Sequence, residues 1–71
     1  MYTTKRYTIY NHRTGEWYAG SGAWFNMFDM AKLYRKVGFA KSGLSQPGLG
    51  RDREDCSIYN VRIELGDKVE E

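Results

Sequence analysis

The sequence is poor in the residues that staple many small domains. Its 71 residues include one cysteine, one histidine and one proline. The single Cys56 cannot form an internal disulfide, which excludes a disulfide-stapled secreted scaffold. Cys56 and His12 cannot by themselves supply the four ligands of a structural zinc site, so we expect no metal and no other cofactor. Stability must come from packing, with self-association as a further source.

Long apolar runs are also missing. No stretch approaches the roughly 20 apolar residues of a membrane-spanning helix, and the first residues lack the apolar segment of a signal peptide. These features and the free cysteine predict a cytoplasmic protein with no membrane partner.

The usual signatures of catalysis are absent as well. The glycine-rich stretch AGSGAW at 19–24 matches neither the dinucleotide fingerprint nor the Walker pattern. His12 lies in a polar turn, and Cys56 lies among acidic residues that disfavour its thiolate. We therefore expect no enzymatic activity.

Aromatic residues, by contrast, are plentiful: six tyrosines, three phenylalanines and two tryptophans. Each buries a large area, which a chain short of other core residues needs. Some of them stand beside cations, and exposed aromatics with basic neighbours can stack bases while the cations hold phosphates. The aromatic residues therefore fit either a core or a contact surface.

The first part of the chain predicts a hairpin. Thr4–Tyr10 is rich in the Thr, Tyr and Ile residues that suit strands, and Glu16–Ala19 returns as a second strand. Gly15 can adopt the positive φ that the turn between them requires. We expect Trp17 to point into the core, which would place Tyr10 and Tyr18 together on the exposed face.

The rest of the chain predicts helices and one more strand. Between Phe25 and Ser45 apolar residues recur at helical spacing, and we expect two short helices joined irregularly near 33–38. Residues 45–57 are predicted to be the most mobile loop. In the strand predicted at 57–65, side chains alternate. We expect its apolar stripe to face the core: Tyr59, Val61, Ile63 and Leu65.

These elements predict a single α+β domain over residues 1–71. Its core covers about 4–65, and 66–71 form a tail. The order β-β-α-β predicts a three-stranded antiparallel sheet with one or two short helices on one face.

Charge is distributed unevenly along the chain. The net charge is only +2, yet residues 1–50 carry seven Lys and Arg against two acids. Such asymmetry favours an interaction surface. The basic and aromatic residues that we nominate for it are Tyr10, Arg13, Tyr18, Trp24, Lys32, Arg35, Lys36 and Lys41.

The opening hairpin resembles that of the GIY-YIG nucleases. The resemblance lies in Tyr7-Thr8-Ile9-Tyr10-Asn11, Gly15 and Tyr18-Ala19-Gly20-Ser21. It implies that Tyr7 and Tyr18 are active-site tyrosines and that Glu64 is a metal-binding glutamate. The chain departs from the family at Lys5-Arg6, where the family has Gly-Ile, and its Arg35 comes later than the family's arginine.

A second resemblance spans about residues 5–65. YTIYNHRTGEWYAG, Trp24, AKLYRKVGFAKSGL and SIYNVRIEL are similar to a group of small, mostly uncharacterised bacteriophage proteins. It implies an accessory protein in the cytoplasm of an infected bacterium that binds a host macromolecule. A host protein is our first expectation, with RNA or DNA as the alternative and a degenerate nuclease as a second alternative.

Overall fold

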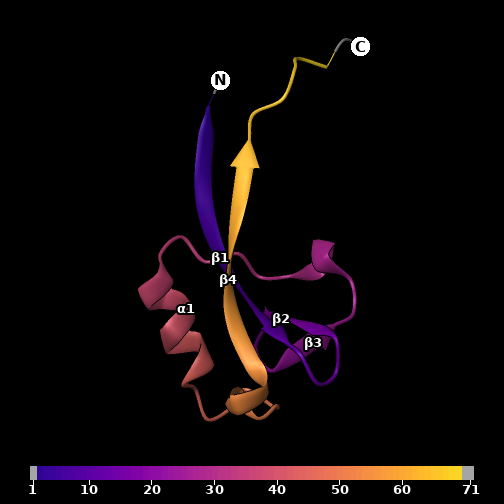
Figure 1. Cartoon of the computed structure of the whole chain (residues 1–71), viewed down its shortest axis with the longest axis vertical. Coiled ribbons are helices and arrows are strands. Elements are labelled where there is room, and N and C mark those ends of the chain that lie inside the picture. Colours follow the sequence, from indigo (N-terminus) through magenta and orange to yellow (C-terminus); the bar gives the residue numbers. More distant parts are fainter. Residues whose placement is uncertain (1, 70–71) are drawn as a thin grey trace.

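The computed structural model describes residues 2–69, which form a small α+β fold (Figure 1). Four strands make one antiparallel sheet in the order β3-β2-β1-β4. One α-helix and two short 3₁₀ turns accompany the sheet. The elements are β1 (Thr3–Asn11), β2 (Glu16–Gly20), β3 (Ala23–Phe25), η1 (Phe28–Met30), α1 (Val37–Leu44), η2 (Arg53–Asp55) and β4 (Cys56–Glu64).

The predicted hairpin is confirmed. β1 and β2 pair antiparallel, with Tyr10 opposite Trp17, and Gly15 has φ 72°. Asn11 closes the turn, because its buried Oδ1 accepts hydrogen bonds from the backbone N–H groups of Arg13 and Thr14, each at 2.9 Å. An Asn side chain that binds the next backbone amides is a recognised turn signal.

The prediction of three strands was wrong, because β3 adds a fourth strand beside β2. Gly20, Ser21 and Gly22 have φ of 95°, 54° and 77°. This run of left-handed residues reverses the chain. Ala23–Phe25 then returns along β2, with Trp24 opposite Tyr18.

The first of the two expected helices is reduced to the 3₁₀ turn η1. In the segment after η1, the backbone N–H and C=O groups form hydrogen bonds with the strands of the sheet instead. Lys32 N–H donates to the Tyr18 carbonyl at 2.9 Å, and Tyr34 exchanges two backbone hydrogen bonds with Tyr7 at 2.7 and 2.8 Å. These bonds occupy groups that a helix would need. The second helix is present as α1.

β1 and β4 pair over their full lengths, from Thr3 opposite Glu64 to Asn11 opposite Cys56. Ile9 lies opposite Ile58 in this ladder, and both contribute to the core. The core cluster is formed by Ile9, Tyr18 and Leu49, with Trp24, Tyr34, Leu44, Cys56 and Ile58 packed against it. Leu44 belongs to α1, so α1 covers the face of the sheet that carries Ile9 and Ile58.

The predicted sidedness of the sheet was inverted. Tyr18 is only 2% exposed and lies in the core, whereas Trp17 lies on the opposite face. The stripe on β4 also faces away from α1, because Tyr59 pairs with Thr8, which precedes the inward-facing Ile9 and so points to the other face. Ile63 pairs with Thr4, which shares the face of Thr8. Successive strand residues point to opposite faces, so assigning one residue to the wrong face also assigns every other side chain of that strand to the wrong face.

The loop after α1 is anchored by Leu49, which the sequence reading had left out of the core. Leu49 is 4% exposed, and its carbonyl accepts a 2.7 Å hydrogen bond from Trp24 Nε1. Arg51 donates through Nε and Nη2 to Glu16 Oε1 at 3.1 and 2.9 Å. These contacts attach the loop to β2 and β3.

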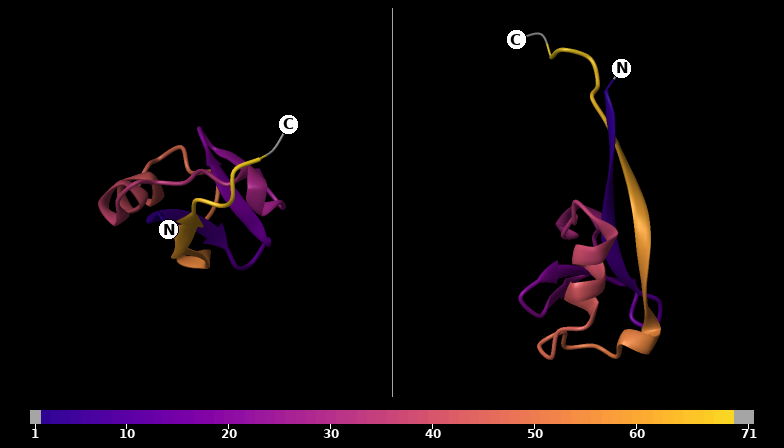
Figure 2. Two further views of the ribbon diagram at one scale, coloured as in Figure 1. Left: turned by 90° about the horizontal axis from the view of Figure 1, so that it is seen from above. Right: turned by 90° about the vertical axis from the view of Figure 1, so that its left-hand side faces the viewer.

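Beyond this body, β1 and β4 continue as a two-stranded ribbon (Figures 1 and 2). The ribbon gives the fold extents of 43 × 23 × 19 Å. Residues 66–69 of the predicted tail have neither helix nor strand, and the end of that tail, 70–71, lies outside the described residues.

Two glycines of α1 should respond oppositely to alanine. A Cβ on Gly43 would overlap the Tyr34 hydroxyl and lie 3.0 Å from its Cζ, whereas a Cβ on Gly38 would have nothing within 4 Å. Alanine favours a helix interior by up to about 1 kcal/mol. Gly38→Ala should therefore raise the melting temperature by a few degrees, and Gly43→Ala should lower it. Thermal unfolding followed by circular dichroism tests both, and equal effects would contradict this packing.

The role of Leu49 can be measured in the same way. Leu49→Ala should lower the free energy of unfolding by about 2–5 kcal/mol, the range for truncating a buried leucine. Leu33→Ala is the matched control, because Leu33 is 39% exposed and should change stability little. Urea denaturation gives both values, and similar small losses would show that the loop is not anchored.

Candidate binding surface

The face of the sheet opposite α1 carries a cluster of aromatic rings, which we call the aromatic face: Tyr10, His12, Trp17, Phe28 and Tyr59. Tyr10 and Trp17 have ring centroids 4.4 Å apart, and Trp17 lies 4.8 Å from Phe28 at an interplanar angle of 65°. Tyr59 completes the cluster at 6.0 Å from Tyr10 and 6.5 Å from Trp17. Edge-to-face pairs in this range contribute about 0.5–1.5 kcal/mol each beyond area burial.

Register explains why these rings meet. Tyr10 is opposite Trp17 on β2, and Thr8 is opposite Tyr59 on β4. Thr8 and Tyr10 are two residues apart and so share a face. Phe28 comes from η1, which places its ring against Trp17 from the side.

His12 ties the cluster to β4. Its Nε2 lies 2.9 Å from Ser57 Oγ and 3.1 Å from the Tyr59 hydroxyl. Each ring nitrogen of a neutral imidazole has either one proton to donate or one lone pair to accept with, so Nε2 makes one full hydrogen bond, to one hydroxyl or the other. These contacts restrain the Tyr59 ring on this face of the sheet.

A hollow of about 430 Å³ opens beside the rings. Its lining residues are Thr8, Trp17, Phe28, Tyr59, Asn60, Val61 and Arg62. Thr8 is fully buried, and among residues 2–69 its hydroxyl has no hydrogen-bond partner. An unpaired buried hydroxyl costs about 1–3 kcal/mol, which the packing around Thr8 must offset.

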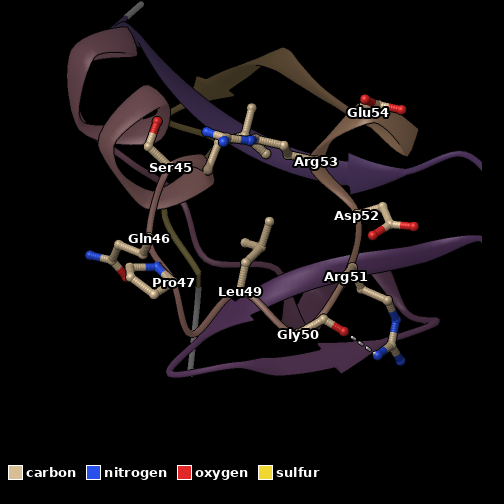
Figure 3. A pocket seen from close by; sticks show the side chains of 10 residues that line it. Ser45, Gln46, Pro47, Leu49, Gly50, Arg51, Asp52, Arg53 and Glu54 are labelled. Atoms are coloured by element: carbon tan, nitrogen blue, oxygen red, sulfur yellow. Dashed lines mark hydrogen bonds between the residues drawn. The ribbon is translucent and has the colours of Figure 1, made fainter.

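A larger hollow of about 580 Å³ lies under the loop after α1 (Figure 3). Leu49 points into it, and the side chains of Arg51 and Glu54 point away from it. Its lining includes two cations, Arg51 and Arg53, and two anions, Asp52 and Glu54. Arg51 is already paired with Glu16. The charges in its lining compensate one another, and its two leucines, Leu44 and Leu49, are committed to the core. This hollow is therefore a weaker candidate than the aromatic face.

The structure places the four hairpin and β3 residues nominated from sequence in different environments. Tyr10 lies on the aromatic face, and Arg13 is exposed in the adjoining turn, 3.9 Å from Asp55. Tyr18 and Trp24 lie on the other face, with centroids 5.0 Å apart. Tyr18 is buried, and the indole N–H of Trp24 is bound to the loop. The expected exposed pair of Tyr10 and Tyr18 is therefore not formed.

The four nominated cations belong to the other side of the molecule. Lys32 lies over the ring of Tyr34, with Nζ 5.2 Å from the centroid, and Tyr34 packs on the core. Lys36 directly precedes α1 and Lys41 is within it, while Arg35 is exposed between Tyr34 and Lys36. In Figure 1, α1 lies to the left of the β1–β4 pair, and β2, β3 and η1 lie to the right. The cations and the aromatic face thus form separate surfaces.

The residues matched to the nuclease pattern are also dispersed. Tyr18 packs on Ile9 in the core, whereas Glu64 lies opposite Thr3 and pairs with Arg62 at 2.9 Å. The six steps from Thr3 to Ile9 along β1 span about 20 Å at strand rise. Tyr7 is half-buried in β1. The geometry does not assemble Tyr18 and Glu64 into one site.

Sequence reasoning missed most of the aromatic face. His12 was read as a plain turn residue, Trp17 and Tyr59 were assigned to the core, and Phe28 to a helix. The pattern that could have found them is the alternation itself. With Ile9 and Ile58 both inward, Thr8, Tyr10 and Tyr59 must be outward.

Between residues 2 and 69, no three His, Cys, Asp or Glu side chains are grouped closely enough to hold a metal ion. Over the same range, no helix combines the length and apolarity needed to cross a membrane.

In comparisons with known proteins, no family model, curated protein or solved structure matches the chain.

Cys56 should react slowly. Burial raises the pKa of its thiol, and the nearby carboxylates of Asp55 and Asp52 raise it further, while a hydrogen bond from Asn11 lowers it. The thiolate is the reactive form. At pH 8, iodoacetamide should therefore alkylate the folded protein several-fold more slowly than the urea-unfolded chain. Mass spectrometry follows the reaction, and equal rates would contradict the burial of this thiol.

Proposed function

We propose that this chain is a non-enzymatic binding protein of the phage accessory type, and that it docks a host protein on its aromatic face. The observation that carries the proposal is the uncovered side of the sheet. α1 and the loop behind it occupy one face, while Phe28 and Tyr59 on the other are 49% and 41% exposed. Large rings left in water on a rigid sheet are typical of interaction surfaces.

The composition of the aromatic face favours a protein partner. None of its five residues carries a permanent charge, and its neighbours on the same side include the apolar Phe25, Val61 and Ile63. The centres of protein interfaces are poor in charge and rich in Tyr, Trp and Phe. The ring contacts and the His12 hydrogen bonds hold the cluster in place, which reduces the entropy lost on binding.

A nucleic-acid partner is the alternative, and the placement of charge weighs against it. Strands that stack bases need cations near the rings to hold the phosphates. Lys32, Lys36 and Lys41 lie with α1 and Tyr34 instead. The cations nearer the rings already have partners. Arg13 lies 3.9 Å from Asp55, Arg62 pairs with Glu64 at 2.9 Å, and Arg6 donates to Thr4 Oγ1 and to the Lys5 carbonyl, each at 3.0 Å.

The test begins with a host protein recovered at fixed stoichiometry after nuclease treatment and then purified. Trp17→Ala and Tyr59→Ala should each weaken its binding by at least about 30-fold, the loss expected for a hot-spot residue. The double variant Lys36→Ala/Lys41→Ala is the matched control on the other side and should bind normally. Titration calorimetry measures the affinities, and circular dichroism verifies the fold of each variant.

The opposite pattern would overturn the proposal. If the lysine variant loses binding while Trp17→Ala and Tyr59→Ala retain it, the aromatic face is not the docking surface. If nuclease treatment abolishes recovery of the host protein and salt steeply lowers the affinity, the partner is a nucleic acid. Binding to nucleic acid depends on salt because counterions are released.

A further inference from the structure

β4 is an edge strand with a free side. It pairs with β1 over nine residues and ends the sheet order β3-β2-β1-β4. Among residues 2–69 no strand pairs with its outer edge. The distal half of the β1–β4 ladder projects from the body as a ribbon (Figure 2). Isolated two-stranded ribbons are marginally stable in water, and a long exposed edge is a template for another strand.

The hydrogen-bond alternation identifies which backbone groups are free. Leu65 N–H donates to the Tyr2 carbonyl at 2.9 Å, and His12 N–H donates to the Asp55 carbonyl at 2.8 Å. In an antiparallel pair, alternate residues direct both backbone groups to the same neighbour. The odd-numbered residues of β4 therefore face β1. The N–H and C=O groups of Asn60, Arg62 and Glu64 point to the open edge.

The side chains at this edge complement a second copy of themselves. In an antiparallel pair of two β4 strands centred on Ile63, Arg62 of each copy lies opposite Glu64 of the other. Ile63 faces Ile63, and Val61 faces Leu65. Ile63 and Leu65 are 37% and 64% exposed in the single chain, so this pairing covers apolar surface as well as joining opposite charges.

The backbone alternation fits the same register. With the two-fold axis at Ile63, the opposing residues Arg62 and Glu64 form a hydrogen-bonded pair, because both direct their backbone groups outward. The two Ile63 residues then form a non-hydrogen-bonded pair, in which side chains approach most closely. Charge is compatible with it: Arg62 lies opposite Lys5 on β1 and pairs with Glu64 of its own chain at 2.9 Å. In this register each Arg62 would lie between its own Glu64 and that of the other copy, so that the four side chains alternate in sign.

The other edge of the ribbon lacks this complementarity. β1 carries Lys5 and Arg6 and no acidic residue. Two copies of this edge would bring cations together, and lysine on an edge strand is a common protection against pairing.

We propose that the chain forms a symmetric dimer in which two β4 edges pair antiparallel about Ile63, giving one continuous eight-stranded sheet. Such an isologous contact closes on itself and leaves the aromatic face of each copy uncovered. The proposal does not rest on the proposed function, and its tests need no partner protein.

Charge exchange tests the register. The wild-type chain should sediment at twice the 8.3 kDa of one chain, with the dimer fraction rising with concentration. Arg62→Glu alone and Glu64→Arg alone should each shift the mass toward the monomer, because like charges then face each other. The double variant Arg62→Glu/Glu64→Arg should dimerise again. An equimolar mixture of the two single variants should form a heterodimer, in which every pair is opposite.

Cross-linking tests the position of the axis. In a Cys56→Ser background, Ile63→Cys should form an intermolecular disulfide in a glutathione buffer, because Cα atoms in such a pair are about 4.5 Å apart. Val61→Cys lies on the same face and is the matched control. Its two copies would be about 13 Å apart along the strands, so it should remain a monomer on a non-reducing gel.

Results of three kinds, on mass, register and closure, would overturn the proposal. One is a mass of a single chain at every concentration up to the solubility limit. Another is a dimer whose mass is unchanged by either single charge variant, or equal cross-linking at 61 and 63. The third is growth beyond two copies, which would mean that β4 pairs with the β1 edge of another copy in an open series.

Discussion

The register between β1 and β4 is the constraint on which the rest of the structure depends. Nine consecutive pairs fix which side chains point to α1 and which point away. Because the side-chain period of a strand is two, no residue can change face without moving all of its neighbours. Ile9 and Ile58 are thereby assigned to the core, and Thr8, Tyr10 and Tyr59 to the opposite face. The covered face supplies stability, and the uncovered face is the one that we propose as a docking surface.

The contacts of the core make this choice of face favourable. Tyr18 fills the centre of the cluster beside Ile9 and Leu49, and α1 can approach because Gly43 leaves room for the ring of Tyr34. The loop after α1 contributes Leu49 and a backbone acceptor for Trp24. A chain of this size has few core residues to spare, so the aromatic rings on the other side are a considerable apolar area left unused by the fold.

The sequence predicted the elements better than the sides of the sheet. The hairpin was found because Gly15 and the β-rich runs are local signals, and β4 because its alternation is strict. Trp17 and Tyr18 are adjacent aromatics, and nothing local says which of them is buried. The core position of Leu49 depends on a contact with a residue 25 positions away. The stretch from Met27 to Tyr34 has helical spacing, but hydrogen bonds to Tyr18 and Tyr7 determine its path.

The alternation of side chains along each strand also explains why the residues nominated for one surface lie on two sides of the molecule. Tyr10 and Arg13 adjoin the aromatic face, while Tyr18 and Trp24 belong with the core and the lysines with α1.

The most direct test of the account is a set of cross-strand Hα–Hα contacts in a nuclear Overhauser spectrum. The register predicts strong contacts for Lys5 with Arg62, Tyr7 with Asn60 and Ile9 with Ile58, the close non-hydrogen-bonded pairs. Contacts displaced by one residue, such as Ile9 with Tyr59, would contradict it.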